Sequence, residues 1–347
     1  MKRRARDRVL SWKAAREAKA AIRQVARLKA ANPARPFCGV LLIEHIGDII
    51  ACEPIIEQLK TSHPGAFVVW VVTPRYATLL TNHPKLDAIV FVQSLLAIEH
   101  IVQSGVFDVA VDLHINGKAT ENAERPYRKT TGNPAIDVNT YVNHGSLLQS
   151  FSESAGLTPR PASPTIYIPE AAVTEVDQLS LPDHFVAVHA SSNYAPKDWP
   201  SAKWRELVQH ILEQYETSVV EIGLASKIEL DHPRFVNLCS KVSLIGTAEL
   251  IRRADFFVGI DSGPAHMANA WRRPALLLFG RYCGSDAFNP YDGYYRDAER
   301  TVILRYRGPL KEQSASAVIA TLEASPLWNE TRAHRGRRDA FNISIPR

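Results

Sequence analysis

Cysteines are few in this sequence, and long apolar runs are absent. Four cysteines stand among 347 residues, and no two of them form a CxxC pair. This pattern argues against a disulfide framework or a structural zinc site, and it fits a reducing cytosol. Apolar stretches such as Phe67 to Val72 have the length of a strand, far below the ~18 residues of a membrane-spanning helix. The basic N-terminus is not followed by an apolar core, so no secretory signal is indicated.

Two common nucleotide-binding signatures are also missing. The sequence contains neither a GxGxxG nor a Walker A pattern, which argues against a dinucleotide dehydrogenase and a P-loop NTPase. The histidines are spread along the chain rather than spaced as metal ligands. We therefore expect neither a bound metal nor an organic cofactor.

The net charge of +5 is unevenly distributed. Residues 1–31 hold eleven Lys and Arg against two acidic residues, a net +9, and residues 326–347 carry a net +3, which leaves −7 for the body. A mildly acidic body with basic ends is not typical of a nucleic-acid-binding surface. Residues 1–31 are rich in helix formers, but their large apolar residues make only a broken stripe. They are predicted to be either a basic helix on anionic lipid or a solvated helix or disordered arm.

The body of the chain alternates short apolar runs with amphipathic stretches. This alternation predicts an α/β fold of two Rossmann-like, doubly wound domains that face each other across a cleft. We expect an arm over 1–35, a first domain over 36–175, a second domain over 182–325 and a basic tail over 326–347. Strands are predicted at 37–43, 66–72, 88–92, 107–113, 185–189, 218–222, 256–260 and 275–279, and helices at 49–62 and 202–215 among others. Ligands of such sheets bind beyond the carboxyl ends of the strands.

The stretch from Ala254 to Gly280 reads as strand, tight turn, helix and strand. Asp261, Ser262 and Gly263 form the turn, and Pro264 suits the first helical position because its missing N–H costs nothing there. The amide groups and dipole of the helix N-terminus favour a phosphate or pyrophosphate, and Gly263 allows a close approach. The alternative is an ordinary turn that binds nothing.

Four segments together resemble the bacterial lipopolysaccharide heptosyltransferases, glycosyltransferase family nine, which have the GT-B fold. The resemblance covers roughly residues 37–325, and the last two segments are quite specific. The segments are the strand followed by IGD at 46–48 with Pro54 downstream, the run from His63 to Val90, SSNYAPKDWP at 191–200 and DSGPAHMANA at 261–270. This resemblance implies transfer of a heptose from an ADP-sugar to a lipid A–core acceptor at the cytoplasmic face of the inner membrane.

The resemblance also implies roles for single residues. Asp48 is the expected catalytic base of an inverting displacement, and the alternative is a cap for the following helix. Lys197 matches the family lysine that contacts the donor phosphates, and the alternative is a solvated loop lysine. His266 either donates to a phosphate or simply packs. The expected donor-binding residues are Lys197, Asp261, Ser262, Gly263, Pro264, His266 and Glu229, with Glu221 as an alternative to Glu229 and with the amide of Ala265 at the turn.

The irregular segment from His114 to Gly145 carries a basic cluster of Lys118, Arg125, Arg128 and Lys129. It is predicted either to bind the acceptor or to be a flexible surface excursion. No DxD sequence, which many metal-dependent glycosyltransferases use, occurs in the chain, so we expect a metal-free reaction. The loops Glu44-His45-Ile46 and His189-Ala190-Ser191 depart from the family pattern. The sequence therefore leaves three alternatives open: a transferase that uses another nucleotide-sugar, a sugar epimerase, or a non-catalytic binding module.

Overall fold

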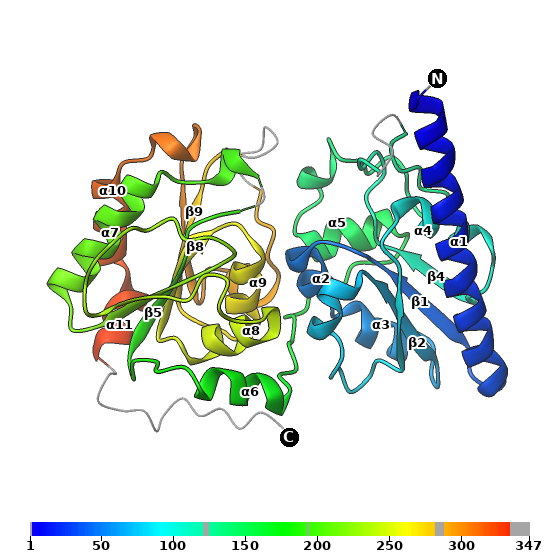
Figure 1. Ribbon diagram of the computed structural model, residues 1–347, viewed down its shortest axis with the longest axis horizontal. Helices are drawn as coiled ribbons and strands as arrows, with labels where there is room; N and C mark the ends of the chain where they lie inside the picture. Colours follow the sequence, from blue (N-terminus) through cyan, green and yellow to red (C-terminus); the bar gives the residue numbers. More distant parts are fainter. Residues whose placement is uncertain (1, 121–124, 193, 282–287, 334–347) are drawn as a thin grey trace. The chain divides into compact units, whose positions relative to one another are not determined.

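The computed structural model describes residues 2–120, 125–192, 194–281 and 288–333. They form two compact units, one of Met1–Tyr167 with Ala287–Arg296 and one of Ile168–Asp286 with Asp297–Arg347. Each unit is built round one parallel β-sheet with helices packed on it (Figure 1). The predicted α/β class with parallel sheets is therefore confirmed.

Unit 1 has a four-stranded sheet in the order β3-β2-β1-β4, in which every neighbouring pair is parallel. Every residue of β1 and β2 is buried, as expected of parallel strands covered on both faces. The strands are β1 (Phe37–Leu41), β2 (Phe67–Val72), β3 (Ala88–Phe91) and β4 (Val109–Asp112); the helices are α1 (Lys2–Ala31), α2 (Ile46–Cys52), α3 (Ile55–Ser62), α4 (Leu95–Gln103) and α5 (Leu147–Ser154), with 3-10 turns at Pro74–Leu79, Tyr141–Asn143 and Gly293–Tyr295.

Helix α1 differs most from the expectation. Residues 2–31 form one continuous helix, so the helical alternative is confirmed and the disordered one is wrong, but the helix packs on unit 1 rather than standing free as an arm. Its buried residues are Ala14, Ala18, Ala21 and Val25, whose spacing of four, three and four puts them on one face. Helix α4 packs against α1 (Figure 1). Alanine allows two helices to approach closely, and a pattern of large apolar residues does not reveal this stripe.

The single helix predicted over 49–62 is two helices in the structure. Helix α2 ends at Cys52 and α3 begins at Ile55, with Pro54 as the N-cap of α3. Proline has no N–H to donate and its ring disfavours a continuing helix, which explains the break. Asp48 therefore lies in the first turn of a helix of only seven residues.

The segment Ala287–Arg296, which the sequence pattern placed in the second domain, belongs to unit 1. The amide of Leu147 donates to the carbonyl oxygen of Pro290 at 3.1 Å, and the Ser146 hydroxyl donates to the buried carboxylate of Asp292. Because Ser146 is also the N-cap of α5, this segment is tied to the start of that helix.

Unit 2 has a six-stranded parallel sheet in the order β10-β9-β8-β5-β6-β7. Its strands are β5 (Phe185–His189), β6 (Ser218–Ile222), β7 (Phe235–Asn237), β8 (Phe256–Ile260), β9 (Ala275–Phe279) and β10 (Thr301–Arg305); its helices are α6 (Glu170–Asp177), α7 (Ser201–Gln214), α8 (Leu244–Arg253), α9 (Gly263–Ala270), α10 (Ala315–Ala324) and α11 (Pro326–Ala333), with 3-10 turns at Ala195–Lys197 and Leu310–Glu312.

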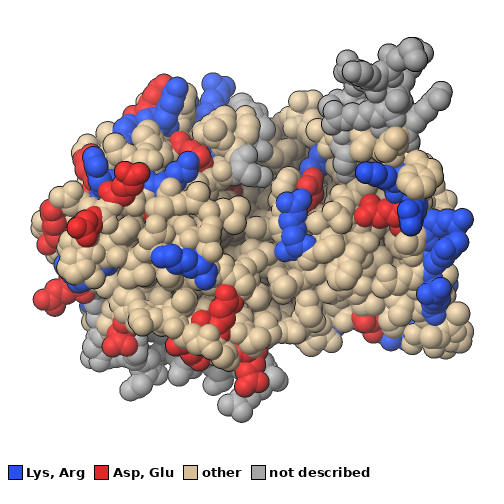
Figure 2. Space-filling view, viewed as in Figure 1, with Lys and Arg blue, Asp and Glu red and all other residues tan. Residues whose placement is uncertain are grey.

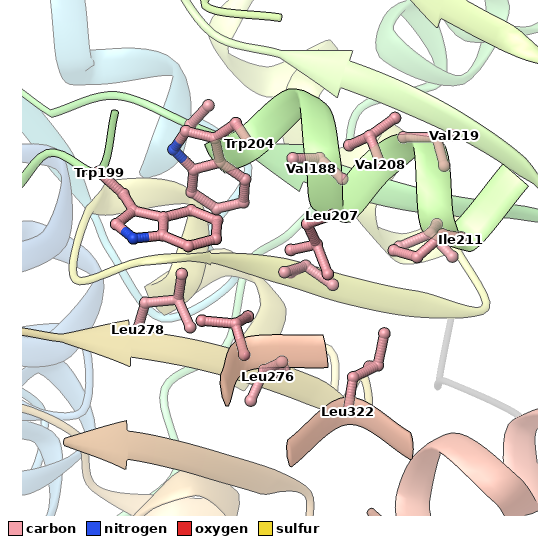
Figure 3. Close-up of a cluster of buried hydrophobic side chains, with 14 of the residues drawn as sticks. Val188, Trp199, Trp204, Leu207, Val208, Ile211, Val219, Leu276, Leu278 and Leu322 are labelled. Carbon is pink, nitrogen blue, oxygen red and sulfur yellow. The ribbon is translucent and has the colours of Figure 1, made fainter. Parts of the chain in front are cut away.

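The core of unit 2 joins strands β5, β8 and β9 to helices α7 and α10 (Figure 3). Trp199 packs edge-on against Trp204 with 5.2 Å between ring centroids, and its indole N–H donates to the carbonyl oxygen of Gln313 at 2.9 Å. Trp199 is thus a core residue. The expected basic tail begins instead with helix α11, and its Trp328 is fully buried in the same core.

Candidate functional site

The predicted site residues follow the strands at which each sheet reverses its order. In unit 1 the order 3-2-1-4 switches between β1 and β4, and in unit 2 the order 10-9-8-5-6-7 switches between β8 and β5. Ligands of open parallel sheets bind at such switch points, beyond the carboxyl ends of the strands. Asp48 and Lys118 follow β1 and β4, whereas Lys197 and Asp261 follow β5 and β8.

In unit 1, Asp48 lies in the first turn of α2, just beyond the carboxyl end of β1. Its Oδ2 accepts the amide N–H of His45 at 3.3 Å, and Nδ1 of His45 lies 3.6 Å from the same oxygen. The side chain of Asp48 is 19% exposed. The residue thus contributes to capping α2, and it also presents part of its carboxylate to solvent.

The environment of Asp48 favours its charged form. Burial by itself raises the pKa of this carboxyl group, but the hydrogen bond and charge of His45 and the charge of Lys118 outweigh burial, so the pKa lies below its usual value. Lys118 is held by Glu44, with Nζ 3.1 Å from Oε1. Asp48 is therefore an anion at neutral pH and can accept a proton.

A buried polar network supports the loop that carries Asp48. Nδ1 of His114 lies 2.8 Å from Oδ1 of Asp112, and Nε2 of His114 accepts the amide N–H of Ile43 at 3.1 Å. The Tyr127 hydroxyl donates to Oδ2 of Asp112 at 2.6 Å. Since Nε2 accepts a hydrogen bond, the ring proton is on Nδ1 and points to the carboxylate. Burial lowers the pKa of His114, although Asp112 opposes this shift.

Sequence reasoning did not assign a role to this network. Asp112 ends β4, and His114 stands two residues further on, so their side chains share one side of the extended chain. A buried strand that ends in Asp-x-His could have indicated this network from the sequence.

The basic cluster of the irregular segment does not act as one group. Lys129 is buried, and its ammonium donates to the backbone carbonyl oxygens of Asp112 and His114, so this lysine is a structural part of the network rather than an acceptor contact. Arg125 pairs with Glu99 at 2.5 Å and is half exposed. Arg128 is exposed, and its backbone amide donates to Glu99 at 3.2 Å.

In unit 2, Lys197 and Asp261 form an ion pair. Nζ of Lys197 lies 2.5 Å from Oδ2 of Asp261, and the two side chains are 23% and 14% exposed. An ammonium group has three donors, so Lys197 can hold Asp261 and a phosphate oxygen together. Asp261 thereby fixes the position of the lysine near the N-terminus of α9.

The turn before α9 is linked to β5 through Ser262. Its hydroxyl lies 3.1 Å from the carbonyl oxygen of Ile260, to which it donates, and 2.9 Å from Nδ1 of His189. Burial lowers the pKa of His189 to about 4, which keeps this ring neutral at physiological pH. Gly223, with φ of +140°, approaches the same ring so closely that a Cβ there would lie 3.3 Å from it.

Three further predictions near this turn concern the helix itself. Helix α9 begins at Gly263, one residue before the first helical position predicted at Pro264, which lies in the first turn. The amide of Ala265, expected at the phosphate, instead donates to the carbonyl oxygen of Ser262 at 3.1 Å. His266 is buried, as expected of a side chain that packs.

The two glutamates considered for the donor ribose differ in exposure. Glu221 is fully buried and accepts hydrogen bonds from the Ser226 hydroxyl at 2.5 Å and the Lys227 amide at 2.7 Å. It therefore organises the loop after β6, and its buried carboxylate is engaged there. Glu229 is exposed and stays a prediction.

Neither a cluster of metal-binding side chains nor a membrane-spanning helix occurs in the part of the chain that the structure describes. Within residues 2–120, 125–192, 194–281 and 288–333, no three His, Cys, Asp or Glu side chains are grouped so that they could hold a metal ion. No helix in those ranges is both long and apolar enough to cross a membrane.

Comparison with known proteins points to one group. The family model "Glycosyltransferase family 9 (heptosyltransferase)" matches residues 119–292. Lipopolysaccharide heptosyltransferase 3 of Escherichia coli (strain K12) is 20% identical over 275 residues, which are 67% of this chain and 79% of that protein. The structure of E. coli ADP-heptose LPS heptosyltransferase II matches with a TM-score of 0.63 at 19% identity, over 85% of this chain and 99% of that one. E. coli heptosyltransferase WaaC, solved with ADP, matches with a TM-score of 0.53 at 17% identity, over 86% and 99%.

Proposed function

Because the chain belongs to glycosyltransferase family 9 and has the two-domain GT-B fold, we propose that it transfers a heptose from an ADP-heptose-type donor to a lipopolysaccharide core acceptor. The names of the relatives and the ADP bound to one of them support this choice of donor and acceptor. Asp48 carries the proposal, because it is the ionised carboxylate that follows β1 at the switch point of unit 1.

The proposed reaction is a single displacement at the anomeric carbon of the donor sugar. The acceptor hydroxyl oxygen forms a bond to this carbon while the bond from the carbon to the diphosphate oxygen breaks. Asp48 takes the hydroxyl proton, and the nucleoside diphosphate leaves with the bonding electron pair. Attack opposite the leaving group inverts the anomeric configuration. A positioned base of this kind contributes typically ~10²–10⁴-fold to the rate.

The residues of unit 2 would hold the departing diphosphate. Lys197, fixed by Asp261, supplies a positive charge, and the N-terminus of α9 adds its dipole and amide groups at Gly263. Both stabilise the negative charge that develops on the leaving group. We propose that these groups suffice without a metal ion, that Ser262, Pro264 and His266 shape the turn, and that exposed Glu229 contacts the ribose.

The acceptor would meet the cations of unit 1, of which Lys118 is partly exposed and Arg125 and Arg128 are exposed. Lys118 lies beyond β4, and Arg125 and Arg128 follow it in the same irregular segment. We propose that these three residues bind acidic groups of the glycan. The lipid-linked acceptor places the reaction at the cytoplasmic face of the inner membrane.

The substitution Asp48→Asn tests the role of Asp48. An amide oxygen can still accept the His45 N–H, so the fold and the cap of α2 should persist. Turnover should fall by ~10²–10⁴-fold because the amide cannot take the proton. The measurement is sugar transfer from ADP-heptose to delipidated core glycan, with thermal unfolding as the check on folding.

Glu57→Gln is the matched control, because Glu57 is an exposed carboxylate of unit 1 that pairs with Lys85. This variant should turn over at the wild-type rate. If Asp48→Asn is as active as this control, Asp48 only caps the helix.

A separate experiment tests the donor. ADP should raise the melting temperature of the protein more than UDP does, since a ligand of the folded state stabilises that state. The opposite order would reject an ADP-sugar as the donor while leaving the role of Asp48 as the base intact.

A further inference from the structure

Helix α1 presents two opposite faces. Its inner face is the buried stripe of Ala14, Ala18, Ala21 and Val25. At 100° per residue, the exposed basic residues centre on the opposite side of the helix. They are Lys13, Arg16, Lys19, Arg23 and Arg27, and all five are exposed. Figure 2 shows Lys and Arg side chains gathered at the edge of unit 1 along which α1 runs.

Two polar anchors fix the rotation of α1 about its axis. The carboxylate of Glu17 accepts the amides of Gln93 and Ser94 at 2.8 and 3.1 Å, at the start of α4. Nζ of Lys29 lies 2.5 Å from Asp108, whose other oxygen accepts the amide of Phe37 at 2.8 Å. The basic face is therefore held in one orientation by the folded unit.

The outer face carries no carboxylate over residues 9–31, the part of α1 whose side chains the structure describes. Glu17 is the one acidic residue of that stretch, and its carboxylate is engaged at α4. Five like charges over 13–27 extend about 21 Å at 1.5 Å per residue. A row of this length repels a basic partner and attracts a broad anionic surface.

Exposed apolar side chains accompany the charges on the same face. Trp12 is 61% exposed and Val9 is 51% exposed, and the guanidinium of Arg16 lies 5.6 Å from the centroid of the Trp12 ring. Tryptophan with an apolar body and a polar N–H suits the interface between water and lipid. A cationic helix that also exposes tryptophan fits a membrane surface better than a nucleic acid, whose backbone requires only charge.

We propose that the outer face of α1, defined by Val9, Trp12, Lys13, Arg16, Lys19, Arg23 and Arg27, docks the enzyme on an anionic lipid bilayer. The helix lies flat on the headgroups with its inner face still packed on unit 1. This docking does not depend on which sugar is transferred. It would bring the enzyme to the surface that holds its proposed lipid-linked acceptor.

Deleting α1 would not test the proposal, because deletion would also uncover the core of unit 1. The triple variant R16Q/R23Q/R27Q instead removes three outer charges and keeps good helix formers. The matched control R205Q/K241Q/K311Q removes three exposed charges of unit 2 and has the same net charge. Both variants should melt as the wild type does, because all six side chains are exposed.

Binding is measured by sedimentation with phosphatidylglycerol-containing vesicles and with pure phosphatidylcholine vesicles. The wild type should bind the anionic vesicles, and less so as salt rises. Each basic residue near such a surface increases binding to the membrane about fivefold, so the α1 triple variant, which lacks three of them, should bind ~10²-fold more weakly. The control variant should bind like the wild type, and Trp12→Ala should also weaken binding. Transfer to a soluble, delipidated acceptor should stay at the wild-type rate in every variant.

Three outcomes would overturn the proposal. The α1 triple variant could bind anionic vesicles as tightly as the control does. The wild type could bind both kinds of vesicle equally. Alternatively, the wild type could fail to bind vesicles yet bind an RNA oligonucleotide through the three arginines, which would mean that the outer face of α1 binds nucleic acid. Each of these leaves the Asp48→Asn result, and so the proposed function, untouched.

Discussion

His189 makes the stability of this enzyme sensitive to acid. Burial at the end of β5 lowers its pKa from 6.5 to about 4, so the folded protein holds the ring neutral. Above pH 6.5 the ring is neutral in both the folded and the unfolded chain, and pH has no effect through it. Between pH 6.5 and about 4 only the unfolded chain binds a proton here, so the free energy of unfolding falls as pH falls. Below about 4 both states are protonated and the loss levels off.

The size of this loss follows from the two pKa values. The interval between 6.5 and about 4, at about 1.4 kcal/mol per pKa unit, corresponds to ~3 kcal/mol. This is a large fraction of the ~5–15 kcal/mol by which a domain is stable. The substitution His189→Asn should remove this component, because asparagine does not titrate, while it keeps a polar group beside the Ser262 hydroxyl.

The assay is urea unfolding at a series of pH values between about 7 and 4.5. The control is His100→Asn, which removes an exposed histidine of α4 and should keep the wild-type pH dependence. His189→Asn should lose less stability than the wild type on acidification, by a difference that approaches ~3 kcal/mol at the acid end. Parallel curves for the wild type and His189→Asn would refute the reasoning, since they would mean that His189 titrates alike in both states.

Two further predictions concern the donor site and the buried network. Lys197→Ala should weaken ADP binding by about ten- to a hundredfold in calorimetry, because a charge-assisted contact to phosphate is worth ~1.5–3 kcal/mol. EDTA should leave transfer unchanged, and activity that EDTA abolishes and Mg²⁺ restores would contradict the metal-free reaction. Tyr127→Phe should lower the free energy of unfolding by ~1.5–3 kcal/mol, because it removes a hydrogen bond to the buried carboxylate of Asp112. Tyr167→Phe, at a partly exposed position, should stay within ~0.5 kcal/mol of the wild type, and equal effects of the two would argue against the network.

The strands and the loops after them could be predicted because their signals are local. A buried parallel strand is a short apolar run, and β1, β2, β5 and β8 all stand where such runs predicted them. The turn after β8 and a helix start within one residue of Pro264 follow from backbone preferences of single residues, although the helix begins at Gly263. Asp48 and Lys197 were found by motif, and the order of strands puts them at switch points.

Tertiary structure decided what depends on partners far along the chain. The alanines of α1 do not mark a buried face in the sequence, because alanine also occurs on exposed helix faces. Only their packing with α4 shows that the helix is anchored. Lys129 looked like a surface cation, but its ammonium meets carbonyl oxygens of residues 112 and 114 in the interior. The segment Ala287–Arg296 returns to unit 1 through contacts with Ser146 and Leu147. A local pattern records what a residue favours by itself, whereas burial and pairing are set by the neighbours that folding brings to it.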